Sequence, residues 1–207
     1  GIALCNTRDA RAEPYLREAR WRIGFNSSLW RQIEVYFARV PEASGVPEAM
    51  TSEAHTNRGL ARQAKGDLAG AIEDYSRAIE IDPRNAMAYS NRGNARNARG
   101  DRAAAIEDFD RAIEINPRFA MAYNNRSTAR SAEGDLDGAM QDCNRAIEID
   151  PRFAMAYMNR GHVRKAKGDL DGAIEDLGRA IQFDPRFAMA YMNRGNIRLA
   201  KGDPNGA

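Results

Sequence analysis

The sequence predicts an all-α protein, an α-solenoid of stacked antiparallel helix pairs. Three observations predict this class. The chain matches itself when it is shifted by 34 residues, each period contains a Gly-Asp pair, and each complete period ends near a proline. A period of this length can hold two helices with their turns. One such pair cannot bury its apolar side alone, so successive pairs must stack on one another.

The repeated residues divide the chain into units. The periodic glycines, each followed by aspartate, are Gly66, Gly100, Gly134, Gly168 and Gly202, and the prolines are Pro83, Pro117, Pro151 and Pro185. They predict a repeat array over 52–207, with complete units at 52–85, 86–119, 120–153 and 154–187 and a partial unit at 188–207. Residues 1–51 do not fit this register and are predicted to form an N-terminal helical cap and linker.

The N-terminal region contains both tryptophans and two candidate helices. Pro14 suits the first position of a short helix that ends near Gly24. A second helix before Pro41 carries an apolar stripe at helical spacing, formed by Leu29, Ile33, Tyr36, Phe37 and Val40. Such helices would cover the exposed end of the first unit, as solenoids require. A degenerate extra repeat and a membrane-surface helix are the alternatives, and the glutamates with few lysines disfavour the second.

The unit 86–119 shows how each period forms two helices. Helix A is predicted from about Ala86 to Arg99, where Gly100 ends it. Asp101 suits the start of helix B, because its charge faces the positive end of the helix dipole. Helix B then runs to about Ile115, before a proline. Small residues are expected where the helices approach, with larger ones between them: Gly93, Ala105 and Ala112, then Tyr89, Ile106, Phe109, Ile113 and Ile115.

Two arginines four residues apart recur in every predicted helix A and therefore share one helical face. Each complete unit also carries an aspartate in helix B, namely Asp74, Asp108, Asp142 and Asp176. Because the two helices are antiparallel, the first arginine should lie close to that aspartate, so that Arg92 pairs with Asp108. An anion-binding arginine stripe is the alternative interpretation.

These units resemble tetratricopeptide repeats (TPRs), as an array of the bacterial type. The family pattern is matched by Tyr89, Gly93, Ala105, Phe109, Ala112 and Pro117. The resemblance covers residues 52–207 and implies a right-handed superhelix. The sequence departs from the pattern in one respect, since Arg92 and Arg96, with their equivalents, replace the usual Leu and Tyr.

The resemblance also implies a concave peptide-binding groove that is lined by the A helices. The positions it selects are polar in most units: Asn57, Ser90, Asn91, Asn94, Asn97, Asn124, Asn125, Thr128, Met158, Asn159, His162, Lys165 and Asn193. Amide side chains both donate and accept hydrogen bonds, so a column of asparagines could hold the backbone of an extended peptide. The alternative is that these asparagines satisfy polar groups between helices.

Two further features bear on the ligand. A clamp for a terminal carboxylate is disfavoured, because Lys165 is the one basic residue at these positions. Met121, Met155 and Met189 recur at the start of A helices, where packing between repeats is the favoured interpretation and a promiscuous binding surface the alternative.

Catalysis is not expected. The sequence shows no phosphate loop, zinc spacing or nucleophile elbow, and predicts no cofactor and no metal. His55 occupies an aromatic packing position, and Cys143 replaces a core residue. With 31 Lys and Arg against 29 Asp and Glu, the net charge of +2 gives no support to nucleic-acid binding. No stretch approaches the ~20 apolar residues of a membrane span.

The sequence therefore predicts a scaffold or adaptor that binds proteins or peptides. The alternative is the substrate-recognition arm of a larger enzyme or of a secretion or assembly component. Self-association through the partial last repeat is a further expectation. The compartment stays open: the cytoplasm is slightly favoured, and export is the alternative because Ala10-Arg11-Ala12 resembles a signal-peptidase site.

Overall fold

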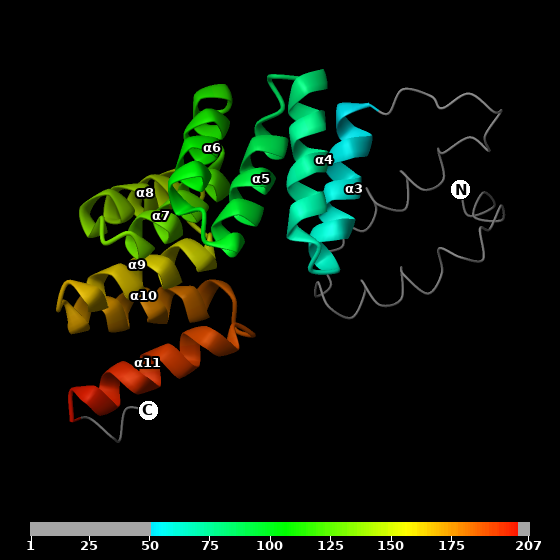
Figure 1. Cartoon of the computed structure of the whole chain (residues 1–207). Helices are drawn as coiled ribbons and strands as arrows, with labels where there is room; N and C mark the ends of the chain where they lie inside the picture. The colour runs from blue at the N-terminus through cyan, green and yellow to red at the C-terminus, as the bar shows by residue number, and fades with distance from the viewer. Residues whose placement is uncertain (1–50, 203–207) are drawn as a thin grey trace, which may run out of the picture. The chain divides into compact units, whose positions relative to one another are not determined.

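A computed structural model describes residues 51–202, which form a stack of helix pairs (Figure 1). The A helices are α3 (Ser52–Ala64), α5 (Ala86–Arg99), α7 (Ala120–Ala132), α9 (Ala154–Ala166) and α11 (Ala188–Ala200). The B helices are α4 (Leu68–Ile81), α6 (Arg102–Ile115), α8 (Leu136–Ile149) and α10 (Leu170–Phe183). Residues 51–202 contain no strand, and the predicted all-α solenoid is confirmed. The helices predicted before residue 51 lie outside the described residues.

The helix ends follow the sequence signals closely. Gly100 adopts a φ of 95°, a left-handed conformation that glycine reaches without the steric cost of a Cβ atom, and it ends α5 as predicted. At the start of α4, Asp67 Oδ1 accepts a hydrogen bond of 2.9 Å from the Gly70 amide. The equivalent aspartates of α8 and α10 make the same cap.

Asp101 is the exception to this capping. It occupies the N-cap position of α6 but forms no side-chain cap, and its Oδ2 lies 3.1 Å from Arg99 Nη2 instead. A Cβ atom at Gly70 would lie 2.2 Å from the capping carboxylate of Asp67. In α6 the residue at that place is Ala104 rather than glycine, but Asn85 caps α5 through the amide of Ala88, so the ion pair with Arg99 is what sets Asp101 apart.

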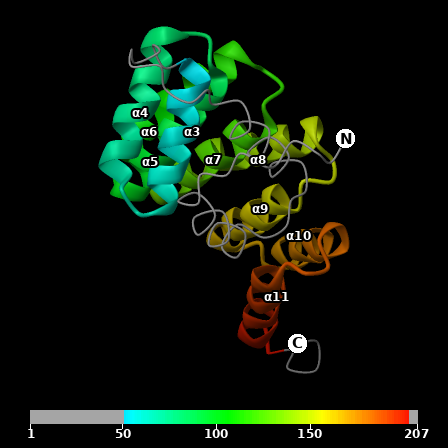
Figure 2. The same cartoon turned by 90° about the vertical axis from the view of Figure 1, so that its right-hand side faces the viewer.

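Helices α5, α7 and α9 each pack against their own helix B and against helix B of the preceding unit, α3 packs against α4, and α11 packs against α10. The A helices of neighbouring units also contact one another: α3 with α5, α5 with α7, and α7 with α9. The helix axes turn along the array, from the upright α3 and α4 to the transverse α9 and α10 (Figures 1 and 2). Because the A helices approach each other, they line the inner side of this turn.

The core is a series of matched large and small residues. Tyr75, Phe109, Cys143 and Leu177 occupy one repeat position in the B helices and are fully buried. A glycine of helix A faces the large residue, and a Cβ atom at Gly93 would lie 2.8 Å from Phe109 Cε1. In the third unit both members change, so that Ser127 stands in the glycine position and Cys143 in the aromatic position. The added volume in one helix is thus matched by lost volume in the other.

Candidate peptide-binding groove

One face of each helix A is available to a ligand. Residues spaced i, i+4 and i+7 lie on the same side of a helix, and in α5 these are Met87, Asn91 and Asn94. We call the set of such residues the groove face. It comprises Glu53, Asn57 and Leu60 in α3, Met87, Asn91 and Asn94 in α5, Met121, Asn125 and Thr128 in α7, Met155, Asn159 and His162 in α9, and Met189, Asn193 and Asn196 in α11. Apart from Glu53, Leu60 and the methionines, all of these side chains are neutral amides, a hydroxyl or an imidazole.

A pocket of about 200 Å³ lies on the groove face between α7 and α9. Three of its lining residues, Thr128, Asn159 and His162, belong to the predicted site. Ser127, Ser131, Ala132 and Val163 complete it. The pocket therefore combines hydroxyl, amide and imidazole groups with a small apolar wall, which suits a peptide backbone better than a charged group.

Hydrogen bonds cross from one unit to the next on this face. Asn159 Nδ2 donates to Asn124 Oδ1 at 2.9 Å and to Thr128 Oγ1 at 3.2 Å. Asn193 Nδ2 lies 2.7 Å from His162 Nε2, which accepts this hydrogen bond when the neutral imidazole carries its proton on Nδ1. These two asparagines satisfy polar groups between helices, as the alternative interpretation of the sequence expected.

His162 is the titratable group of the pocket. Partial burial lowers its pKa below the ordinary value of 6.5, and the nearby charge of Lys165 lowers it further. The imidazole is therefore neutral at pH 7, and the pocket then carries no formal charge of its own.

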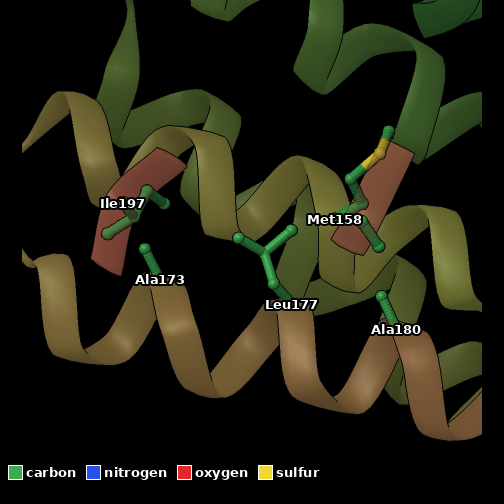
Figure 3. Close-up of a cluster of buried hydrophobic side chains, with 6 residues drawn as sticks. Met158, Ala173, Leu177, Ala180 and Ile197 are labelled. Carbon is green, nitrogen blue, oxygen red and sulfur yellow. The ribbon is translucent and has the colours of Figure 1, made fainter. Parts of the chain in front are cut away.

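Three predicted site residues are buried, and this part of the prediction is corrected. Ser90 is 2% exposed and Asn124 is 1% exposed, while Met158 is 7% exposed and packs against Leu177 of α10 in the core cluster that includes Ile197 of α11 (Figure 3). All three precede the groove-face asparagine by one residue. Neighbouring residues of a helix point about 100° apart, so these side chains turn into the contact between units.

The remaining predicted residues stay accessible. Asn57, Asn91, Asn125 and Asn193 are partly exposed, as are Asn94 and Asn97 of α5. Lys165 is exposed on α9. Within residues 51–202, Asn91 has no hydrogen-bond partner for its amide, in contrast to Asn159.

The sequence analysis did not place the methionines on the groove face. Met87 is 55% exposed, Met121 and Met155 are each 42% exposed, and Met189 is 51% exposed. They belong to none of the buried core clusters of residues 51–202, and their exposed sides are available to a ligand, while packing between repeats stays a prediction. The sequence spacing predicts this placement, because each methionine precedes the groove-face asparagine by four residues and so lies on the same side of the helix.

The arginines form a charged contact between helices A and B, which we call the Arg–Asp seam. It comprises Arg58, Arg62 and Asp74, and the equivalent sets Arg92, Arg96 and Asp108; Arg126, Arg130 and Asp142; and Arg160, Arg164 and Asp176. Arg92 Nη2 lies 2.7 Å from Asp108 Oδ1, and Arg96 Nη1 lies 2.9 Å from Oδ2. The predicted pairing is confirmed, and the second arginine joins it.

Aromatic rings and backbone carbonyls complete the seam. The Arg92 guanidinium stands 5.5 Å from the centre of the Tyr89 ring, a cation–π distance that recurs in the units of Tyr123, Tyr157 and Tyr191. Arg96 Nη1 also donates to the carbonyl of Ala104 at 3.3 Å. Arginine thus replaces the leucine and tyrosine of the family pattern by bonding across the helix pair.

The first arginine of a unit also reaches back to the preceding unit. Arg92 Nη1 donates to Ser76 Oγ at 3.1 Å, and Arg126 Nη1 pairs with Asp110 Oδ1 at 2.5 Å. Arg160 Nη1 donates to Asn144 Oδ1 at 2.9 Å. The next equivalent position is Gly178, which has no side chain. The strength of this link between units therefore differs along the array.

The first unit modifies the seam. His55 replaces the stacking tyrosine, and its Nδ1 lies 3.4 Å from Asp74 Oδ1. Burial raises the pKa of Asp74, but hydrogen bonds from Arg58 and His55 and the charge of Arg62 outweigh it, so the pKa lies below the ordinary 3.8. Asp74 is therefore ionised at neutral pH, and His55 has a structural place in the seam.

The described residues contain one cysteine, Cys143, and its thiol is buried. Burial raises the pKa of the Cys143 thiol to about 11, so it stays protonated and unreactive at neutral pH. Residues 51–202 hold no cluster of three or more metal-ligating side chains. Among the helices of that range, none has the length and apolar character that crossing a bilayer requires.

Stacked helix pairs with an accessible inner face define a helical-repeat protein. Sequence profiles identify its family: one described as TPR repeat matches residues 59–100 and 161–202, and two described as Tetratricopeptide repeat match 86–119 and 120–153. The chain belongs to the tetratricopeptide repeat family, whose fold is generally a non-catalytic scaffold for protein interactions. No curated protein matches the sequence.

Solved structures show the same fold. The crystal structure of MamA is 28% identical, with a TM-score of 0.62 over 71% of this chain and 86% of MamA. A thermophilic TPR protein of Thermus thermophilus is 20% identical, with a TM-score of 0.66 over 73% and 84% of the two chains. The first TPR of Spaghetti, bound to the HSP90 peptide SRMEEVD, is 25% identical, with a TM-score of 0.56 over 58% and 96%.

Proposed function

We propose that this protein is a non-catalytic scaffold that holds an extended peptide segment of a partner protein along the groove face. The observation that carries the proposal is the pocket of Thr128, Asn159 and His162 between neighbouring A helices. The peptide-bound structure of a similar TPR supports this use of the fold. The groove-face asparagines would bind the peptide backbone, because amides both donate and accept hydrogen bonds.

The charge of the groove face disfavours acidic peptides. The peptide in the Spaghetti structure ends in Glu-Glu-Val-Asp. Here the groove face carries no basic residue, and Lys165 lies beside it as a single cation. A cluster of carboxylates would lose water without gaining enough positive partners.

Selection of binding peptides from a random twelve-residue library on the full chain tests the proposal. Selected peptides should bind the unmodified chain and lose at least about tenfold in affinity for the triple variant Asn91→Ala/Asn125→Ala/His162→Ala, which also removes the imidazole of the pocket. Gln141→Ala removes an exposed amide from the B helix α8 and is the matched control. Peptides that bind all three proteins equally would show that the groove face is not the binding surface.

Two related roles follow from the same surface. The array could act alone as an adaptor, or as the recognition arm of a larger enzyme or assembly component. Self-association is a second candidate interaction, because Tyr191, Met192 and Leu199 of α11 are exposed apolar residues. Sedimentation equilibrium on the chain and on its Met192→Gln variant tests self-association, because only self-association makes the apparent mass depend on concentration and on Met192.

A further inference from the structure

The methionines of the groove face form a second column beside the asparagines. Met87, Met121, Met155 and Met189 recur every 34 residues, and 42 to 55% of each residue remains exposed. Each lies one helical turn before its asparagine on the same face. Methionine side chains are flexible and polarisable, and they adapt to apolar groups of different shapes. The groove face therefore offers one apolar contact and one amide per unit.

The groove face carries almost no charge, whereas the sequence as a whole is rich in charged residues. Charged residues make up 29% of the sequence, yet Glu53 at the first unit is the only charged residue on the groove face. The charges of the arginines are taken up in the Arg–Asp seam on another side of the same helices. A charged ligand side chain would find no partner along the groove-face residues of α5, α7 and α9. The complementary ligand is uncharged over this length.

The spacing of the units restricts the conformation of that ligand. From α3 to α9, each helix A is in contact with the next, and packed helices lie about 8–10 Å apart. Three residues of a polyproline II helix advance about 9 Å and return the side chain to the same face. In a β-strand, by contrast, the third residue points to the opposite face. A polyproline II segment therefore places every third side chain toward successive methionines.

The backbone of such a segment suits the asparagine column. A polyproline II helix makes no internal hydrogen bonds, so its carbonyl groups remain available as acceptors. The amide of Asn91 has no partner within residues 51–202 and can donate to one of them. Apolar contact and backbone contact then repeat together in each unit.

We infer that the groove face binds a partner segment in the polyproline II conformation that carries an apolar side chain at every third residue. This inference rests on the proposed function and adds the chemistry of the partner to it.

The probe is a fluorescein-labelled peptide of four Leu-Pro-Pro triplets, which places leucine at every third residue. The control peptide has the same composition with its leucines grouped at one end. Fluorescence anisotropy measures the affinity of both for the full chain, for Met121→Gln/Met155→Gln and for Asn91→Ala/Asn125→Ala. Both methionines are exposed, and melting temperatures will show that the variants fold alike.

The expected result is preference for the triplet peptide by about tenfold or more, and a loss of about tenfold or more when the two methionines become glutamine. Equal binding of both peptides, unaffected by the methionine changes but weakened by the asparagine changes, overturns this inference and leaves the proposed function standing. If the triplet peptide does not bind, the inference is overturned. If it binds and no groove variant weakens the binding, both the inference and the groove face as the binding surface are overturned.

Discussion

The Arg–Asp seam and the groove face are built from adjacent residues of the same helices, yet they differ in charge and in exposure. Asn91 belongs to the groove face and Arg92 to the seam, and this Asn-Arg pair recurs in every unit. The helix directs the two side chains about 100° apart. Asp108 in the seam is nearly fully buried, whereas Met87 on the groove face is more than half exposed. The comparison shows how a repeat can keep its charges in structural contacts while its binding surface stays neutral.

The largest effect on stability is expected when the buried carboxylate of the seam is removed. Asp108→Ala leaves Arg92 and Arg96 without their shared anion, and loss of one partner of a buried pair costs about 3–5 kcal/mol. We expect urea denaturation to show a loss of this size in the free energy of unfolding. Glu107→Ala, at the exposed neighbouring position, should change it by less than about 0.5 kcal/mol. Equal effects of the two substitutions would contradict the structural role of the seam.

A second test concerns the close approach of the helices beneath the seam. Gly93→Ser places a side chain against Phe109, and overpacking of this kind costs about 1–3 kcal/mol. Adding Phe109→Cys reproduces the Ser127 and Cys143 combination and should restore part of the loss. Gly178→Ser, inside α10 where an added Cβ atom would meet no neighbouring side chain, is the control. Thermal denaturation of the four proteins measures the effect, and a larger loss at Gly178 than at Gly93 would contradict the packing argument.

The pH dependence of stability tests whether ionised Asp74 stabilises the first unit. The pKa of Asp74 is lower in the folded protein than its ordinary value of 3.8. The unfolded chain therefore takes up the proton first, and the stability that Asp74 contributes is complete above about pH 4 and lost as the pH falls through the folded pKa. Asp74→Asn should flatten the dependence of the unfolding midpoint below about pH 4. An unchanged slope would show that Asp74 is not held by its arginines.

The smallest effects on stability are expected on the groove face. Asn91→Ala should change the free energy of unfolding by less than about 0.5 kcal/mol, because its amide has no partner in residues 51–202. Asn159→Ala should cost about 1 kcal/mol, since the nearly buried Asn124 loses its donor. Chemical denaturation of both variants checks the order. A costlier Asn91→Ala would indicate that the groove face is structural throughout.

The sequence predicted the fold and the seam more completely than the groove. The 34-residue spacing alone predicts both helices of a unit, and the antiparallel turn then brings Arg92 to Asp108. Burial was harder to predict, because Ser90 and Asn91 are neighbours and only the packing of the next unit decides which of them faces solvent. The bond between Asn193 and His162 depends on side-chain rotamers and on the rotation between units, which no spacing in the sequence encodes.

The link from each first arginine to the preceding unit makes the array mechanically uneven. The accepting position holds Ser76, then Asp110, then Asn144, then Gly178, so this link is made by a hydroxyl, a carboxylate and an amide in turn. At the last joint Gly178 offers no such acceptor, and Lys201 pairs with Asp171 across it instead. In a stack whose units contact only their neighbours, each joint bears load separately. Under a pulling force the array would act as springs of unequal stiffness in series, because the bond that the first arginine contributes changes from joint to joint.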